Sequence, residues 1–404
     1  MPRDVVLPAR SLRALDMLAF FVADAQTGFG PFVAVYLTAQ KWTEVQIGLA
    51  LSIGTTAMMV SQIPGGALVD AITNKRTAAA IGILGITVSA LLLALAPMQL
   101  STIAALVLQA TASCVLTPAI AAVSLLLVGH AALGERLGRN ARFASIGNGL
   151  AAAVMGAIGA TFSTRWVFLL TAALGLPALA ALAAIPPAAA KRKRTGSGQD
   201  SLLGGAWAIV RDRRLLVFGG CTILFHLSNA AMLPLAGIEV TRRAGDQANL
   251  IIAACIVVPQ VVVALSSPWV GRSAGTWGRR PILLLGWAAL PVRGLMLAFL
   301  PGPWLLVAGQ AVSGVSAAVF GVMLPLLAAD LTRESGHFNL CLGMLGFTVA
   351  IGATLSTLLA GWIATVAGAQ AAFLALSGAG AAGTLLLWLA MPETRDAGIP
   401  RVVG

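Results

Sequence analysis

Long apolar segments recur along almost the whole chain, separated by short polar connections. Uninterrupted runs of about 18 or more uncharged residues are typical of helices that span a membrane. Five such runs lack Asp, Glu, Lys and Arg, and they cover 45–69, 143–164, 166–190, 215–238 and 247–271. Two longer uncharged tracts, 77–134 and 335–392, are too long for one span and predict helical hairpins.

The pattern as a whole predicts about twelve membrane-spanning helices. Their expected ranges are 12–37, 45–69, 77–97, 101–128, 143–164, 166–187, 215–240, 247–271, 281–300, 304–329, 338–364 and 369–391. The strands of a β-barrel would be about ten residues long with alternating polarity, and the sequence lacks that pattern. The first apolar segment is too long for a cleavable signal peptide, so we expect it to act as its own insertion signal.

Composition supports an all-α membrane protein. The chain is 58% hydrophobic and 10% charged, with a mean hydropathy of +0.92, whereas soluble domains are about 25% charged. The four cysteines, Cys114, Cys221, Cys255 and Cys341, fall inside expected spans without CxxC spacing. We therefore expect buried free thiols, and the sequence predicts neither a disulfide framework, a metal site nor a cofactor.

The net charge of +12 would suit a nucleic-acid-binding protein, but its distribution indicates topology instead. If the N-terminus and the even-numbered connections lie on one side of the membrane, the other side keeps only Lys41, Arg165, Arg242 and Arg243. Cytoplasmic connections carry the excess of Lys and Arg in membrane proteins. We therefore expect a multi-pass protein of the cytoplasmic (inner) membrane, with both termini in the cytoplasm and no nucleic-acid partner.

A Pro-, Lys/Arg- and Gly/Ser-rich stretch after residue 186 divides the expected spans into six and six. Such a composition is typical of a solvated linker. We expect an N-terminal six-helix bundle at 1–187, a cytoplasmic linker with an amphipathic surface helix at 188–214, and a C-terminal six-helix bundle at 215–404.

The two halves carry similar residues at matching places. Each has a glycine at a helix end and then a basic turn, at 66–76 and 271–281. Aligning the first and seventh spans on Pro31 and Pro234 brings Gln26 opposite Asn229, and the fourth and tenth spans each carry a glutamine, Gln109 and Gln310. Repeated halves are how many transporters build a site near the middle of the bilayer.

The span count, the six-plus-six division and the stretch GALVDAITNKR at 66–76 resemble the Major Facilitator Superfamily. That family has the pattern G-x-L-x-D-R-x-G-R-R/K after its second span. The sequence matches the pattern at Gly66, Leu68, Asp70 and Lys75 and departs from it at Ala71, Thr73 and Asn74. The second copy keeps Gly271, Gly278, Arg279 and Arg280 but has Gly275 in place of the acid.

The resemblance implies two six-helix bundles that work by alternating access, with spans 1, 4, 7 and 10 around a central cavity. It also implies that the motif holds the two halves together in the outward-open state. The candidate gate residues are Gly66, Asp70, Lys75, Arg76, Arg279 and Arg280. Asp16, Arg142, Asp330 and Arg333 lie at the same rim and are either part of this gate or ordinary solvated charges.

Asp24 is the leading candidate for a working residue, because a charge near the centre of the bilayer is costly and this acid lies near the middle of the first span. A carboxylate there can take a proton from one side and release it to the other. The alternative is a structural acid satisfied by neighbouring helices. His226 lies at similar depth in the seventh span and is either a core histidine or a partner in proton or substrate binding. The remaining cavity candidates, Gln26, Asn229, Gln109 and Gln310, are equally compatible with interhelical hydrogen bonding.

Arg293 is the one cation away from the ends of the expected spans. It lies toward the outer end of the ninth span, which the resemblance places at the periphery of the fold. We expect its side chain to extend to the outer interface, with an internal partner as the alternative.

These features predict a monomeric, proton-coupled exporter of a small organic compound. Few fixed charges among the cavity candidates favour an apolar, weakly polar or cationic solute. Gln109 stands where many proton-coupled members have an arginine, and the fifth span lacks the proline of a typical drug-exporter motif. Uptake or facilitated diffusion of a small metabolite is therefore the alternative. A membrane-embedded sensor or enzyme is disfavoured, because the sequence contains no P-loop, HExxH or G-x-S-x-G motif in a suitable context.

Overall fold

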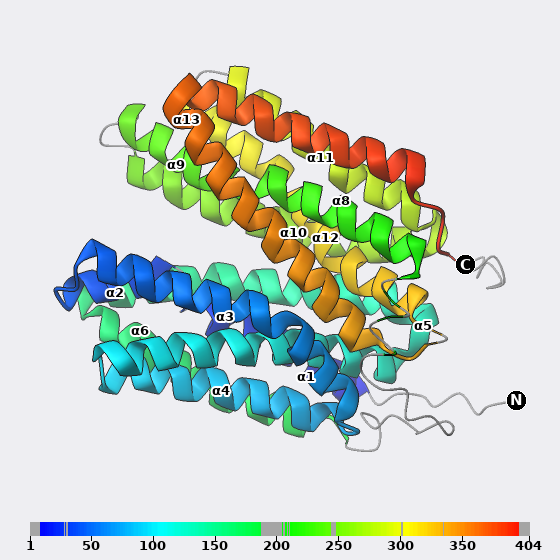
Figure 1. Cartoon of the computed structure of the whole chain (residues 1–404). Helices are drawn as coiled ribbons and strands as arrows, with labels where there is room; N and C mark the ends of the chain where they lie inside the picture. Colours follow the sequence, from blue (N-terminus) through cyan, green and yellow to red (C-terminus); the bar gives the residue numbers. More distant parts are fainter. Residues whose placement is uncertain are drawn as a thin grey trace, which may run out of the picture. The chain divides into compact units, whose positions relative to one another are not determined.

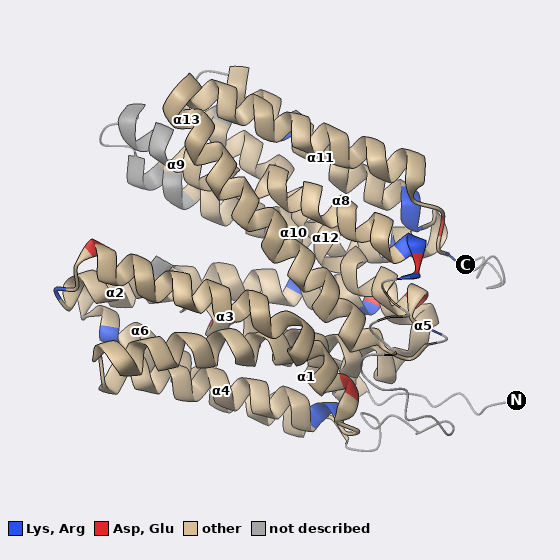
Figure 2. Ribbon diagram, viewed as in Figure 1, with Lys and Arg blue, Asp and Glu red and all other residues tan. Residues whose placement is uncertain are grey.

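The computed structural model describes residues 9–186 and 211–395 except 28, 30, 244–247, 300, 301 and 334, together with 204, 207 and 209. Across these residues every regular element is a helix, and nine of the helices are long and apolar enough to span a membrane. The expected all-α membrane class is therefore confirmed. Figure 2 shows that charged residues are sparse along the helical ribbons and gather near helix ends.

The chain divides into two compact units. The first comprises Met1–Asp200 with His337–Met344, and the second comprises Ser201–Gly336 with Leu345–Gly404. Helices of the first unit are α1 (Ala9–Thr27), α2 (Pro31–Ala39), α3 (Glu44–Ala71), α4 (Lys75–Leu95), α5 (Gln99–Thr161) and α6 (Thr164–Ala183). The second unit contains α8 (Arg213–Asn229), α9 (Met232–Arg243), α10 (Ala248–Thr276), α11 (Arg279–Phe299), α12 (Pro303–Leu331) and, after its first turns, α13 (Phe338–Ala390) (Figure 1).

In α5 and in α13, two expected spans follow one another as two helices with a kink at a single glycine between them. The bends lie at Gly129 in α5 (φ 71°) and at Gly368 in α13 (φ 86°), backbone angles that glycine adopts without a steric penalty. The expected first and seventh spans are each split instead, into α1 with α2 and α8 with α9. Counted in this way, the described helices are consistent with twelve spans.

The stretch 129–142, which the apolar pattern marks as a connection, is helical from residue 130 onward. Its residues explain the difference, because Ala, Leu, Glu and Arg are strong helix formers and Gly129 alone makes the turn. The helix of the fifth span therefore begins in polar residues, before its apolar run starts at residue 143. The consequence is that Arg136 and Arg139 project from a regular helix rather than from a loop.

Local sequence signals fix several helix starts. Thr43 and Gln46 form a capping box at the start of α3, with backbone-to-side-chain hydrogen bonds of 2.9 and 3.3 Å. Asn74 caps α4 and Asp212 caps α8, each accepting the backbone N–H two residues further on.

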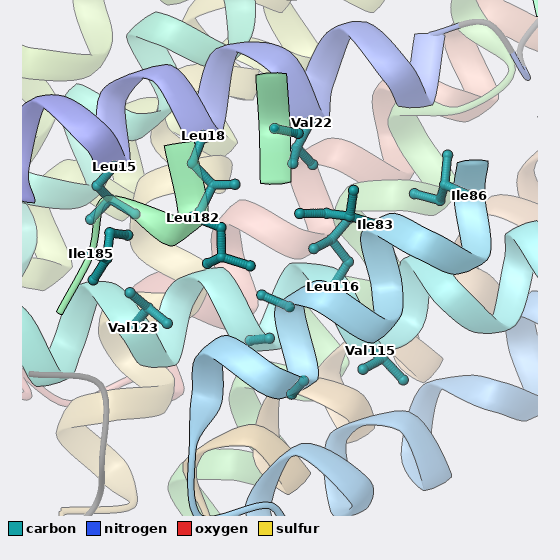
Figure 3. Close-up of a cluster of buried hydrophobic side chains, with 14 of the residues drawn as sticks. Leu15, Leu18, Val22, Ile83, Ile86, Val115, Leu116, Val123, Leu182 and Ile185 are labelled. Atoms are coloured by element: carbon teal, nitrogen blue, oxygen red, sulfur yellow. The ribbon is translucent and has the colours of Figure 1, made fainter. Parts of the chain in front are cut away.

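The first unit is built around a packed apolar core. Leu15, Leu18 and Val22 recur at helical spacing on α1 and meet residues of α4, α5 and α6, including Ile83, Leu116 and Leu182 (Figure 3). Because lipid tails are as apolar as these side chains, close fit rather than exclusion of water holds such helices together. Gly82 illustrates that fit, since a Cβ atom there would lie 2.7 Å from the Cβ of Leu116. This core holds α1, which carries Asp24 and Gln26, against α5.

Candidate functional site

Asp24 lies in a buried contact between α1 and the later part of α5. The residue is 4% exposed, and its Oδ1 atom has no hydrogen-bond partner among the described residues. α5 approaches α1 at Gly147, where a Cβ atom would lie 2.6 Å from the carbonyl oxygen of Phe20 and 2.9 Å from that Oδ1. The missing side chain at 147 therefore makes the space that the carboxylate occupies.

Gln26 and Gln109 come together on either side of one serine. The side-chain nitrogen of Gln26 lies 3.4 Å from Ser113 Oγ, and that of Gln109 lies 3.2 Å from the same oxygen. Both glutamines line a cavity of about 230 Å³ in the first unit. Its other lining residues are Phe29, Leu51, Gly54, Thr55, Met58 and Leu106. This cavity offers amide and hydroxyl groups on an otherwise apolar wall.

Asp24 and Gln26 face different neighbours. Two residues on an α-helix project about 200° apart, so the carboxylate meets Gly147 while the amide of Gln26 meets Ser113. Asp24 is not among the residues that line the 230 Å³ cavity. The structure thus places the acid and the cavity on opposite sides of α1.

In the second unit, Asn229 and Gln310 come together through Arg293. The guanidinium donates to Asn229 Oδ1 at 2.6 Å and to Gln310 Oε1 at 3.0 Å, and so joins α8, α11 and α12. Arg293 is 1% exposed. The expectation that it extends to the outer interface is therefore wrong, and the alternative, an internal partner, is what the structure contains.

The direction of side chains on a helix explains this error. The Cα–Cβ bonds of an α-helix tilt toward its N-terminus, so Arg293, near the end of α11, points back along the helix. One signal for this cluster was present in the sequence. Arg293 is the one cation away from the ends of the expected spans, and Asn229 and Gln310 provide amides in other spans.

His226 lies among aromatic rings rather than among polar groups. Its ring is 4.7 Å from that of Phe320 and 5.2 Å from that of Phe225, and Phe225 also packs on Trp287 at 4.6 Å. The Nε2 atom has no hydrogen-bond partner among the residues that the structure describes. Gly352 of α13 fits closely here, since a Cβ atom there would lie 2.9 Å from the Cβ of His226.

Four of the expected gate residues cap helix ends within their own unit. Lys75 Nζ donates to the carbonyls of Val69 and Ile72 at the end of α3, at 2.6 and 2.7 Å. Arg279 donates in the same way to the carbonyl of Ala274 in α10, at 2.6 Å. Cations at helix C-termini are favourable, because they satisfy orphan carbonyls and complement the helix dipole.

Arg76 and Arg280, which follow Lys75 and Arg279 in the chain, also make corresponding contacts in the two units. The guanidinium of Arg76 lies 3.4 Å from the carbonyl of Ala183 in α6, and Arg280 donates to the carbonyl of Trp388 in α13. Each unit therefore uses a pair of adjacent cations to tie together the ends of two helices.

Asp70 and Gly66, the other two gate candidates, contact the first turns of α13, which belong to the first unit. The Asp70 carboxylate accepts the backbone N–H of Leu340 at 2.8 Å and that of Asn339 at 3.3 Å, together with the Asn339 side-chain amide at 2.8 Å. A carboxylate at a helix N-terminus is stabilised by the unpaired N–H groups and the helix dipole.

Two glycines make this approach possible. A Cβ atom at Gly66 would lie 2.2 Å from the carbonyl oxygen of Asn339, and one at Gly343 would lie 2.3 Å from that of Gln62. Since real Cβ atoms do not approach a carbonyl oxygen so closely, α3 and α13 can meet in this way only with glycine at both positions.

The acids near these helix ends are paired rather than solvated. Asp16 is 2% exposed and is bridged by Arg136 and by Arg139, the latter at 2.7 Å. Asp330 bridges Arg279 at 2.9 Å. Arg142 and Arg333 are exposed.

Glu393 is a helix-capping acid that the sequence did not single out. It accepts the backbone N–H groups of Arg279 and Arg280 at 2.8 and 3.0 Å, at the start of α11. Burial raises the pKa of Glu393, but hydrogen bonds from the backbone of Arg279, Arg395 and Arg280 outweigh burial, and the net pKa lies below its ordinary value. Gly278 (φ 108°) leaves room for this carboxylate, since a Cβ atom there would lie 2.6 Å from Glu393 Oε2.

Comparison with protein families gives a match over most of the chain. A family model described as Major Facilitator Superfamily matches residues 15–242 and 220–402. An uncharacterized MFS-type transporter of Mycobacterium tuberculosis is 38% identical over 406 residues, covering 98% of this chain and 96% of that protein. The class B tetracycline resistance protein of Escherichia coli is 30% identical over 112 residues, 28% of this chain and 27% of that protein.

Two solved structures share the fold. The human organic anion transporter MFSD10 superposes with a TM-score of 0.72 at 16% identity, covering 94% of this chain and 100% of that one. The Escherichia coli fucose:proton symporter superposes with a TM-score of 0.73 at 16% identity, covering 93% of this chain and 97% of that one.

Proposed function

The chain belongs to the Major Facilitator Superfamily, and we propose that it is a proton-coupled exporter of a small organic compound. Members of this family are transporters, so the protein is a multi-pass membrane transporter and not an enzyme. We propose the substrate class, the direction of transport and the coupling ion from the residues described above.

The observation that carries proton coupling is the environment of Asp24. A carboxyl group near the middle of a span, 4% exposed and with one oxygen unpartnered among the described residues, is stable there mainly in its protonated, neutral form. Opening the contact with Gly147 to water would let the group lose its proton. Asp24 would therefore change its protonation state as α1 moves, as a proton carrier must.

The cavity beside Gln26 and Gln109 is the proposed substrate subsite of the first unit. Its amides and the Thr55 hydroxyl can orient a polar group, while Phe29 and Met58 offer apolar contact. The volume of about 230 Å³ lies below the usual size range of small-molecule sites, roughly 300–1,000 Å³, which favours a small solute. A small organic solute with an apolar body fits this description.

Two relatives add support by analogy. The tetracycline resistance protein matches a quarter of the chain, and export of an organic compound would be consistent with that relationship. The fucose:proton symporter shares the fold and by its name couples transport to protons. The relationship to the tetracycline resistance protein is the reason to propose export rather than uptake. The distribution of Lys and Arg is the reason to propose a cytoplasmic-membrane location with both termini in the cytoplasm.

The contact of Asp70 and Gly66 with the first turns of α13 is the proposed latch of the transport cycle. Its polar contacts are hydrogen bonds from an amide and from backbone N–H groups to a carboxylate at a helix end, so they can break and re-form as the helix moves. The cations Lys75 and Arg76 would support the latch by holding the ends of α3 and α6 in place. Arg279 and Arg280 would hold the corresponding helix ends of the second unit.

Flux in proteoliposomes, with and without a pH gradient, tests the function. The solutes are chosen from a compound panel by the thermal stabilisation they give. We expect the gradient to accelerate flux in the wild type and to have no effect on flux in Asp24→Asn. Glu44→Gln, which removes an exposed acid at the start of α3, is the matched control and should behave as the wild type. Flux that ignores the gradient and is unaltered in Asp24→Asn would refute proton coupling through Asp24.

A further inference from the structure

Arg293 is a full positive charge enclosed in the apolar part of the second unit. Its two described hydrogen bonds both go to neutral amide oxygens, those of Asn229 and Gln310. Among the side chains that the structure describes, no carboxylate forms an ion pair with it. The charge is therefore solvated by dipoles but not neutralised.

The same cluster contains hydrogen-bond donors that lack acceptors. Arg293 Nε and Gln310 Nε2 are buried and unpartnered within the described part of the chain, and both residues are 1% exposed. The shortage is thus entirely of acceptors and of negative charge. A buried site with this imbalance is complementary to an anion that accepts several hydrogen bonds.

A purely structural role explains the imbalance poorly. Amide–amide hydrogen bonds between α8 and α12 would join the helices without the desolvation of a guanidinium, which costs several kcal/mol. A buried arginine of a membrane-spanning helix is normally paired with an acid or with backbone carbonyls of the same chain, and the described partners of Arg293 are neither. A permanent fixed cation is useful where its partner is bound and released.

The position of Asn229 gives the site a means of opening. Asn229 is the last residue of α8, and α9 begins at Met232 after an interruption of the span. The backbone N–H of Ala231, freed by this interruption, donates instead to Ser356 Oγ at 3.0 Å. A change at the interruption would withdraw the Asn229 amide from Arg293 and expose an N–H edge of the guanidinium.

We propose that Arg293, Asn229 and Gln310 form a binding site for the carboxylate of a small organic monoanion. The two amides hold the guanidinium in the empty site, and the carboxylate replaces the Asn229 oxygen while accepting from Arg293 Nε and Gln310 Nε2. This inference gives the solute of the proposed exporter a negative charge, and it departs from the expectation of an apolar, weakly polar or cationic solute. The claim that this anion is transported rests on the proposed function, whereas the claim that it binds does not.

Thermal unfolding of the purified full-length protein in detergent tests the binding step without any gradient. A negative result in the export assay would therefore not change the result of this binding test. The probes are acetate, benzoate and octanoate as sodium salts, with benzamide as the neutral analogue and chloride as the inorganic anion, all at constant ionic strength. We expect at least one carboxylate to raise Tm in a saturable manner, with little effect from benzamide or chloride.

Arg293→Gln should weaken carboxylate binding by about 10- to 100-fold, the loss expected for charge-assisted hydrogen bonds. Arg272→Gln, which removes an exposed cation from α10, is the matched control and should bind as the wild type does. Gln310→Glu serves if Arg293→Gln does not fold, because it supplies the missing acid internally. It should raise Tm in the absence of ligand and abolish the shift with carboxylate.

Three outcomes overturn the proposal. The first is that no carboxylate stabilises the protein. The second is that chloride or benzamide stabilises it as much as benzoate, which would mean that the site does not select an organic anion. The third is that the carboxylate shift survives in Gln310→Glu, or in a folded Arg293→Gln.

Discussion

The side-chain amide of Asn339 donates a 2.8 Å hydrogen bond to the carboxylate of Asp70, although 269 residues separate the two in the chain. The same carboxylate holds the backbone N–H of Leu340. One acid of α3 thus serves as the cap of a helix that begins far away in sequence. This relationship makes Asp70 the most direct point at which to perturb the proposed latch.

Replacing Asp70 with asparagine should loosen the first turns of α13. Hydrogen bonds to a charged acceptor are worth about 1.5–3 kcal/mol, and a neutral amide retains only part of that. If the latch stabilises the outward-open state, the cavity becomes more accessible from the cytoplasmic side. The measurement is maleimide labelling of a cysteine placed at Thr55, in inside-out and right-side-out vesicles of a variant without native cysteines. Glu44→Gln is the control, and labelling that is identical in Asp70→Asn and wild type would count against the latch.

A methyl group at Gly343 should disturb the same contact by steric means. The added Cβ atom would lie 2.3 Å from the Gln62 carbonyl oxygen, and overpacking of this kind costs about 1–3 kcal/mol. We expect Gly343→Ala to lower Tm and to change labelling in the same direction as Asp70→Asn.

Gly361→Ala is the matched control for that variant, because it lies in the same helix with nothing within 4 Å of the added atom. It should leave Tm unchanged or raise it slightly, since alanine is favoured over glycine in a helix by about 1 kcal/mol. Equal effects of the two substitutions would show that the close approach of α3 and α13 does not matter.

Gly147→Ala should change the packing around Asp24 while leaving its carboxyl group in place. The new methyl group would meet the Phe20 carbonyl at 2.6 Å and the Asp24 carboxylate at 2.9 Å, so α1 must move away from α5. We expect a stability loss of about 1–3 kcal/mol and a weaker dependence of flux on the pH gradient. Gly156→Ala, in open space on the same helix, should change neither. Full gradient dependence in a folded Gly147→Ala would show that Asp24 needs no closed contact.

Glu393 should make stability depend on pH. Because the folded-state pKa of this acid lies below its ordinary value of 4.5, it contributes stability that is fully present above that value and is lost as the pH falls through the folded pKa. The wild type should therefore lose thermal stability with acidification below about pH 4.5, and Glu393→Gln should lose less over the same window. A Tm profile in acid that is the same for both proteins would contradict the capping role of Glu393.

Several features of the fold followed from local patterns. Uncharged runs predicted the membrane helices, and the paired basic turns predicted a repeat that the structure displays at Lys75 and Arg279. The apolar pattern does not predict the helical stretch after Gly129, because the helix of the fifth span begins in polar residues before its apolar run. The bend there depends on one glycine with a positive φ angle, which no periodicity reveals.

The candidate sites were harder to predict because they depend on which helices meet. Gln26 and Gln109 lie in different spans of the sequence, and only packing shows that Ser113 brings them together. Arg293 was assigned to the wrong environment because depth along a helix says nothing about the direction of a long side chain. The partners of Asp70 lie hundreds of residues away, and a single sequence carries no signal for such a pair.

The opposite orientations of Asp24 and Gln26 on α1 have a consequence for kinetics. A solute in the cavity beside Gln26 does not occupy the space of the carboxylate, so protons and solute do not compete for one volume. Acidification would then alter the rate at which a loaded carrier reorients, while the solute itself is displaced only through movement of the helix. Plots of solute transport rate against solute concentration at different pH values should accordingly show mixed rather than competitive inhibition by protons.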